Sequence, residues 1–283
     1  MAASSFRVAR RRVQNAIFVG FCYAVTAVAL IALAAILFTL LKNGAAGINL
    51  DLFTKAVPPE GEKGGLADGI IGSILMCGEG MAIALIIGIL AGTWLAEYGG
   101  TSRYGIVVRF LNDVLLSAPS ILIGLFVAQI MITAFIHHPS GYAGGVALAL
   151  LAIPVITRTT EDVLLLQPVS LRESGVALGT PFWTVIRTII WRASSSGILT
   201  GALLAFARIS GETAPLLFTA LGNNFISFDM YHAMSALPLS IFQLTTGSAD
   251  QVQLAWTGAL LVSAAVLVVT IVARLLSQEQ KRG

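Results

Sequence analysis

Residues 69–96 read GIIGSILMCGEGMAIALIIGILAGTWLA, an apolar run whose single acidic side chain is Glu79. Backbone polar groups inside a bilayer must be satisfied within their own segment, so an apolar run of this length predicts a membrane-spanning helix. The alternating apolar and polar pattern of a transmembrane barrel strand is absent from it. We therefore expect this chain to fold with the bilayer, rather than water, as its main solvent.

The composition of the whole chain agrees with that expectation. The 283 residues are 57% hydrophobic and 11% charged, with a mean hydropathy of +0.87, whereas soluble domains carry about 25% charged residues. This excludes a soluble enzyme, a disordered chain, a coiled coil and a disulfide scaffold. The net charge of +3 is too small and too scattered to indicate nucleic-acid binding.

Five more apolar runs predict five more membrane helices. They are residues 16–41, 110–136, 139–157, 196–219 and 251–273. The expected fold class is therefore an all-α membrane protein with six transmembrane helices.

The basic residues between these runs predict the orientation of the chain. Thirteen Lys and Arg residues fall at the two termini and in the loops 97–109 and 158–195, but only three fall in the loops on the opposite side. Because cytoplasmic loops carry the excess of basic residues, both termini are expected in the cytoplasm.

We expect one domain, since no repeat or long linker divides the chain. We expect residues 1–15 to form a cytoplasmic segment, 16–276 a single transmembrane domain with its core at 69–276, and 277–283 a cytoplasmic tail. The long loop 220–250 contains the apolar run 236–244, which is too short to span. That run is either a re-entrant or interfacial helix or an external loop packed on the bundle.

Signatures of catalysis are absent from the sequence. There is no phosphate-cradling GxxxxGK[ST] loop, no HExxH zinc pair and no GxSxG nucleophile elbow. We expect no catalytic residue, no metal ligand and no cofactor bound by this chain. If ATP drives its work, another chain must hydrolyse it.

The most structured inter-span sequence is PVSLRESGVALGTPFW at residues 168–183. Ser170 is expected to cap a short helix, with Glu173 completing a capping box and Gly179 ending that helix in the left-handed conformation. Thr180 and Pro181 are expected to cap and begin a second helix. Two short helices at a fixed bend offer a rigid knob for a partner protein.

One basic residue, Arg208, falls inside an expected span, where a guanidinium costs about 2.5–3.5 kcal/mol even on the lenient insertion scale. Glu212 lies four residues further on, so both are expected on one helix face, close enough to pair. The pair is either a structural lock of the bundle or an anion site, since the planar fork of Arg suits an oxyanion.

Two motifs resemble a known family. Glu173-Ser174-Gly175, with Gly179 four residues later and Ile189 ten after that, resembles the EAA coupling motif of ABC importer permeases. Residues 207–220, ARISGETAPLLFTA, closely resemble the GETAPLLFTA signature of inorganic-phosphate importer permeases of the PstA type, and residues 117–126 and 96–98 resemble further segments of it.

This resemblance implies a type I ABC importer permease in the inner membrane. It implies four kinds of partner: a homologous permease, two ATPases that bind ATP and Mg²⁺ and grip residues 168–190, an extracytoplasmic phosphate-binding protein, and inorganic phosphate itself, besides membrane lipid. It assigns ATPase coupling to the region of Arg172, Glu173, Ser174, Gly175 and Gly179.

The substrate pathway is expected to include Arg208, Glu212 and Thr213. Ser117 and Ser120 flank Pro119 and either offer hydroxyls to the substrate or satisfy helix carbonyls, the second being favoured. Glu79 lies mid-span between two glycines and either hydrogen-bonds within the bundle or joins the Arg208 pair. Asp113 is expected at a helix end near the interface.

Three alternatives to a phosphate importer stay open. The first is a permease for another oxyanion such as molybdate or sulfate. The second is an ion-coupled secondary carrier or channel that uses Arg208 and Glu212, and the third is a purely structural membrane subunit.

Overall fold

The computed structural model describes residues 2–59, 61–62 and 64–279, and these residues are almost entirely helical. Met1 and residues 280–283, which belong to the expected terminal segments, lie outside this part of the chain. The long helices are α1 (Ala2–Gly44), α3 (Ala67–Trp94), α4 (Arg103–Ser117), α6 (Gly141–Leu165), α9 (Trp191–Ser210) and α12 (Ala249–Glu279). The shorter elements are η1 (Ala45–Gly47), α2 (Asp51–Thr54), η2 (Leu95–Gly99), α5 (Ser120–Val127), η3 (Ala128–Ile136), α7 (Val169–Ala177), α8 (Phe182–Val185), η4 (Ile186–Ile190), α10 (Leu216–Thr219) and α11 (Leu237–Leu244).

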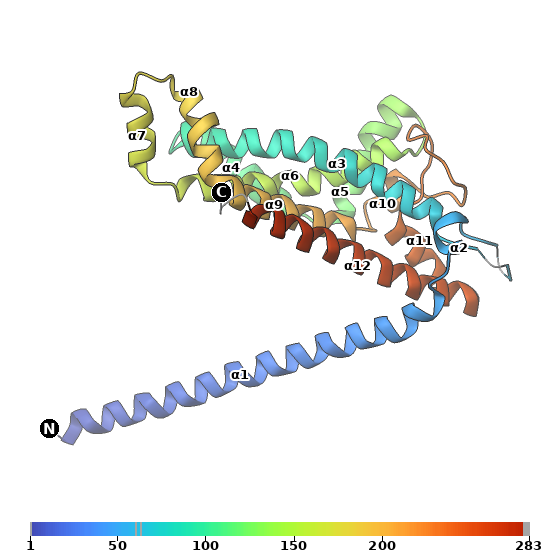
Figure 1. Ribbon diagram of the computed structural model, residues 1–283, viewed down its shortest axis with the longest axis horizontal. Helices are drawn as coiled ribbons and strands as arrows, with labels where there is room; N and C mark the ends of the chain where they lie inside the picture. Colours follow the sequence, from blue (N-terminus) through green and yellow to red (C-terminus); the bar gives the residue numbers. More distant parts are fainter. Residues whose placement is uncertain (1, 60, 63, 280–283) are drawn as a thin grey trace.

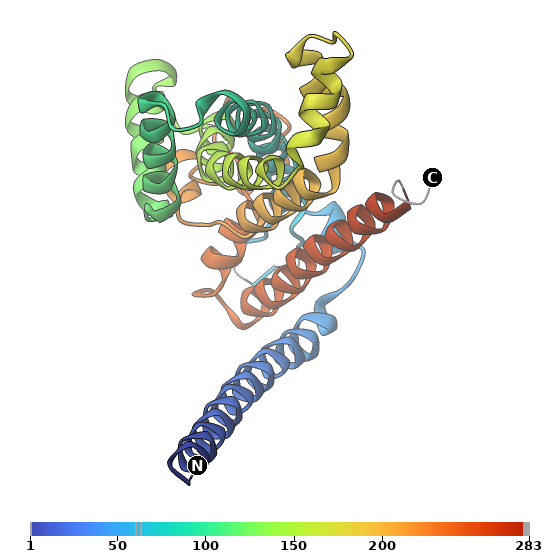
Figure 2. The same ribbon diagram turned by 90° about the vertical axis from the view of Figure 1, so that its left-hand side faces the viewer.

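The centre of the bundle is the packing of α3 against α6, which lie side by side in Figures 1 and 2. Gly80, Gly88 and Gly92 of α3 are buried, and each packs directly against α6, where they meet Gly145, Ile156 and Thr157 in turn. Small residues let two backbones approach closely, which matters in lipid because apolar side chains gain little there by leaving the solvent. The two helices run in the same direction.

The first and last long helices lie at the edge of the bundle. α1 extends away from the rest of the chain and contacts α12 only near its own C-terminal end (Figures 1 and 2). There, Gly44 packs directly against Leu260 and Gly47 against Thr257. The start of α1, the end of α12 and the α7–α8 hairpin all lie toward the left-hand side of Figure 1, with the start of α1 well separated from the hairpin.

The third expected span, 110–136, is not one helix, and this expectation was wrong. α4 ends at Ser117, and the segment from α5 to Ile136 leaves it at an angle of 107°. Pro119 lacks a backbone N–H and restricts the residue before it, Ala118, to the extended conformation that it adopts here. The described residues therefore hold five long apolar helices, or six crossings if the bent pair counts as one.

Two other span boundaries also differ from the prediction. The fourth span continues to Leu165, and a continuous helix begins again at Phe182, so the loop expected at 158–195 is much shorter. The fifth span ends at Ser210 rather than at 219, and the chain breaks before α10.

The apolar run 236–244 forms α11, which packs against α12 and α3. Leu237, Leu239 and Leu244 are buried, and Leu237 N–H donates to Ser73 Oγ of α3 at 2.7 Å. α11 is thus a short helix that packs on the bundle and also lines the cavity described below through Leu237, so it combines features of both alternatives.

Candidate functional site: the coupling end and the α9–α10 break

The helices α7 and α8 project from one end of the bundle as a compact hairpin (Figure 1). Gly179 joins them with a φ of 77°, the left-handed conformation predicted for it. Gly175 is buried, and a Cβ there would lie 2.7 Å from Val185, so the close packing of α7 on α8 requires a glycine.

The predicted caps of these two helices were wrong. α7 begins at Val169, with Pro168 in the N-cap position and no side-chain cap, so Ser170 is inside the helix and Glu173 completes no capping box. Pro181, not Thr180, precedes α8. In both cases a proline with an extended ψ takes the N-cap position itself, and no side chain caps the helix.

The outer face of the α7–α8 hairpin presents both charged and apolar side chains. Glu173, Ser174 and Gly179 are exposed. Exposed apolar side chains surround them. Leu178 is 83% accessible, and Val169 and Val176 each expose at least half as large a fraction of their surface as Leu178 does. Apolar patches of this kind, rimmed by polar groups, mark surfaces that bind a protein partner.

Arg172 differs from its neighbours because it points into the molecule. Its Nε and Nη2 atoms donate to the two carboxylate oxygens of Glu97 at 2.8 and 2.6 Å, and it also donates to the carbonyls of Leu164 and Gln167. The side chains of Arg172 and Glu97 are 16% and 2% accessible. The hydrogen bonds with Glu97 raise the pKa of Arg172 above its ordinary value, against burial, which lowers it.

A second ion pair lies at the same end. Arg109 of α4 donates to Glu161 of α6 at 2.6 Å, where the carboxylate is 4% accessible. The same guanidinium donates to the carbonyls of Gly100 and Leu95 at 2.7 and 3.2 Å. Arg109 and Arg172 thus hold the turn that ends α3. Sequence reasoning missed Glu97, Arg109 and Glu161, because their partners lie far away along the chain.

Arg208 lies in the last turn of α9, and its side chain is exposed. Glu212 follows the end of that helix, so the prediction that both share one helix face was wrong. Gly211 leaves the helical conformation, and Pro215 cannot continue a helix that reached it. Among the ion pairs formed by the described residues, none joins Arg208 to Glu212.

The other expected pathway residues are spread over three elements. Ser117 Oγ donates to the carbonyls of Asp113 and Val114 at 3.0 and 3.1 Å, so it satisfies its own helix, as favoured above. Ser120 begins α5, and Thr213 lies in the break, where its carbonyl accepts from Leu216 N–H.

Glu79 lies apart from Arg208, in the α3–α6 interface. Its carboxylate packs directly against Gly145 of α6. Its Oε2 is buried without a hydrogen-bond partner within the described structure, which leaves its role open.

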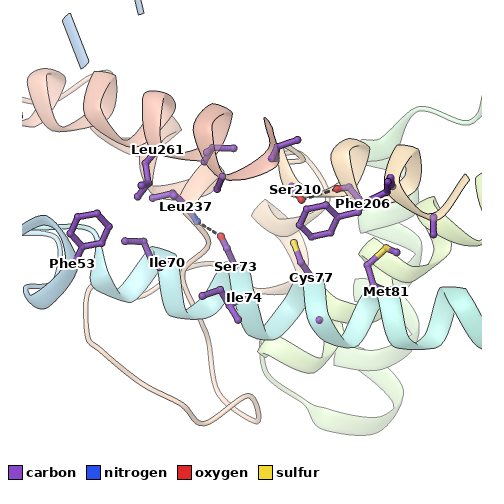
Figure 3. A pocket seen from close by; sticks show the side chains of 16 residues that line it. Phe53, Ile70, Ser73, Ile74, Cys77, Met81, Phe206, Ser210, Leu237 and Leu261 are labelled. Carbon is purple, nitrogen blue, oxygen red and sulfur yellow. Dashed lines mark hydrogen bonds between the residues drawn. The ribbon is translucent and has the colours of Figure 1, made fainter. Parts of the chain in front are cut away.

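A cavity of about 520 Å³ lies between α3, α9 and α12 (Figure 3). Its lining is almost entirely apolar, with Ser73 and Ser210 as the hydroxyl groups. None of the residues that line it is charged, so this cavity offers no ionic group to an anion. Glu212 instead lines a smaller adjoining recess, which shares Ser73 and Ser210 with the cavity.

Two of the three histidines meet at the other end of the molecule. The His138 and His232 rings stack with centroids 5.4 Å apart, and Asp229 accepts from His232 and from Tyr231 N–H. These two contacts lower the pKa of Asp229. In the part of the chain that the structure describes, no three His, Cys, Asp or Glu residues are placed to hold a metal ion.

Comparison with known proteins places this arrangement in a family. The profile of the family described as "Binding-protein-dependent transport system inner membrane component" matches residues 84–282, which include both the α7–α8 hairpin and the α9–α10 break. The chain belongs to this family of membrane transport permeases. The permease is 50% identical over 272 residues to a protein of Haemophilus influenzae named phosphate transport system permease protein PstA, covering 96% of each chain.

Further relatives agree. The protein of that name from Pasteurella multocida is 51% identical and aligns with 87% of the permease and 88% of its own length. A PstA 1 protein of Mycobacterium tuberculosis is 35% identical over 82% of the permease and 77% of its own length. Among solved structures, a chain of the MetNI methionine ABC transporter in an inward-facing conformation superposes with a TM-score of 0.61, covering 75% of the permease and 94% of that chain. Its sequence identity of 17% supports the fold alone.

Proposed function

We propose that this chain is a permease subunit of an ATP-driven importer that moves inorganic phosphate into the cytoplasm. The observation that carries the proposal is the 50% identity to a phosphate transport permease over 96% of both chains. It is supported by the fold, which is shared with an ABC transporter chain. The chain makes and breaks no bond in this scheme, because ATP and Mg²⁺ bind to separate ATPase subunits.

The α7–α8 hairpin is the proposed binding site for an ATPase subunit. Its outer face is exposed, partly apolar and carries Glu173, as a protein-docking knob requires. The N- and C-terminal helix ends lie at the same end of the molecule (Figure 1), and that end holds most of the basic residues. We therefore assign it to the cytoplasm.

Phosphate is proposed to pass Arg208. A guanidinium offers several N–H donors in a planar fork, which matches two oxygens of a phosphate better than a lysine does. The exposed Arg208 lies in the last turn of α9, just before the helix break, so its guanidinium is accessible to an anion. A homologous permease would complete the path, and a phosphate-binding protein would dock at the opposite end.

Uptake of radiolabelled phosphate in cells that express the full transporter tests this proposal. Arg208→Ala is expected to lower uptake at least tenfold at an unchanged amount of assembled complex. Arg158→Ala serves as the control, because Arg158 is also exposed but already pairs with Asp162 at 3.3 Å. Wild-type uptake in Arg208→Ala would contradict the assigned path, and competition by molybdate or sulfate equal to that by phosphate would contradict the substrate.

A further inference from the structure

The α7–α8 hairpin, called the coupling hairpin from here on, makes one buried ion pair with the bundle besides its apolar contacts. Arg172 lies in α7, the first helix of the hairpin, and Glu97 lies in η2, the turn that ends α3. The two side chains meet through two hydrogen bonds, at 2.8 and 2.6 Å, across 75 residues of sequence. Bidentate arginine–carboxylate contacts fix both distance and direction.

Further hydrogen bonds fix Arg172 and the turn that carries Glu97. The remaining donors of Arg172 reach the carbonyls of Leu164 and Gln167, at the end of α6 and just after it. The turn that carries Glu97 is held by Arg109, which donates to the carbonyls of Leu95 and Gly100. A displacement of α7 therefore pulls on the ends of α3 and α6 together.

The hairpin also makes apolar contacts. Gly175 packs on Val185 and Ile189, which belong to α8 and η4, so α7 and α8 form one hairpin. Leu171 of α7 packs in a cluster with Leu164 of α6 and Ala96 of η2. The ionic contact of Arg172 with Glu97 adds a charged and directional link to the same turn at the end of α3.

We infer that the Arg172–Glu97 pair is the link that transmits movement of the coupling hairpin to α3. Arg172 is then a positioning residue that faces inward, not a contact of the ATPase, and Glu97 is its necessary partner. The inference rests on the proposed function, in which an ATPase moves the hairpin. Since α3 and α6 form the packed centre of the bundle and α3 lines the large cavity, the link delivers ATPase movement to the membrane interior.

The test uses the full transporter, with its ATPases and binding protein, in proteoliposomes. A thiol is introduced by Gly78→Cys in a Cys22→Ser, Cys77→Ser background. Gly78 lines the cavity on α3, and a Cβ there meets no atom within 4 Å. The rate at which a maleimide modifies this thiol is measured with and without nucleotide, together with phosphate transported per ATP hydrolysed.

Glu97→Gln is expected to reduce the nucleotide-dependent change in that rate at least fivefold and phosphate transported per ATP at least tenfold. Asp162→Asn is the control, because Asp162 lies next to Glu161 at the same end of α6 but pairs with Arg158 and takes no part in the contacts that hold Glu97. Its nucleotide response per assembled complex is expected to stay within twofold of wild type. A normal response in Glu97→Gln, or an equal loss in Asp162→Asn, would overturn the inference.

A second variant separates linkage from folding. Removing one partner of a buried pair leaves an uncompensated charge and destabilises the fold, whereas removing both is far milder. Glu97→Gln combined with Arg172→Gln is therefore expected to assemble better than Glu97→Gln alone and still to lack the nucleotide response. Restored coupling in this double variant would refute the link.

The same experiment distinguishes failure of the proposed function. Suppose that the complex with Gly78→Cys and an intact Arg172–Glu97 pair responds to nucleotide but transports no phosphate. Phosphate is then not the substrate, and the comparison with Glu97→Gln still tests whether the pair transmits movement. A wild-type thiol that ignores nucleotide refutes ATP-driven movement, and with it the inference.

Discussion

Replacing Gly92 by alanine tests the close packing at the centre of the bundle. A Cβ at this position of α3 would lie 2.5 Å from the Thr157 carbonyl oxygen and 2.7 Å from Thr160 Cβ, both on α6. Ordinary contact begins near 3.4 Å, so the helices must separate by about 0.9 Å along that line. A gap of this size forfeits about a quarter to a half of each contact energy of ~0.1–0.2 kcal/mol, and over roughly thirty atom pairs the loss is ~1–3 kcal/mol.

Gly78→Ala on the same helix is the matched control for this prediction, because its Cβ meets no atom within 4 Å. There alanine is expected to be neutral or to stabilise the helix by up to about 1 kcal/mol, since glycine is the poorer helix former. The assay is thermal unfolding in mild detergent, in which 1 kcal/mol corresponds to a shift of about 2–4 °C for a chain approaching this size. Equal midpoints for Gly92→Ala and Gly78→Ala would contradict the packing argument.

Three further predictions follow from single contacts. Gly179→Ala places an L side chain at a φ of 77°, which costs about 1–2 kcal/mol. Because no atom obstructs the added methyl group, the bundle is expected to assemble normally. ATPase binding is expected to weaken by about 5- to 30-fold, as measured by titration with purified ATPase. Trp191→Phe removes the Nε1 donor to Thr93 Oγ1 at 3.1 Å and leaves a buried hydroxyl unpaired, so unfolding is expected about 1–3 kcal/mol easier, and Thr93→Val in the same chain should recover part of that loss in the same thermal assay. Ser117→Ala removes only a hydroxyl that bonds its own helix, and labelled-phosphate uptake within twofold of wild type is expected, whereas a tenfold loss would return Ser117 to the substrate path.

Hydropathy located the membrane helices, because every span needs an apolar run of similar length. It did not locate their breaks, because the apolar residues on both sides of Ala118 and Gly211 let each run read as one continuous span. The signals were nevertheless present. Pro119 follows the end of α4 closely, and the Gly211-Glu212-Thr213 sequence before Pro215 marks the end of α9. Proline alone is not sufficient, since Pro154 lies inside α6.

The coupling hairpin was predictable as two short helices, because Gly179 is a local stop signal and its left-handed φ is confirmed. The inward direction of Arg172 was not predictable. Its partner Glu97 lies 75 residues away, and no local pattern pairs them. The glycine repeat on α3 is visible in the sequence at multiples of four, yet only the structure shows that α6 is the helix it packs against.

The helix break changes how a cation at position 208 is stabilised. In a continuous helix, Glu212 would lie one turn away and neutralise it; here α9 ends at Ser210, so Arg208 lies in the last turn. The partial negative charge at a helix C-terminus stabilises a cation there by about 0.3–1 kcal/mol. That is less than half of the roughly 2.5–3.5 kcal/mol that a guanidinium costs in hydrocarbon. The remainder requires water, a partner chain or an anion at the exposed side chain, and this requirement supports the proposal that Arg208 lines a polar path, which uptake by Arg208→Ala tests.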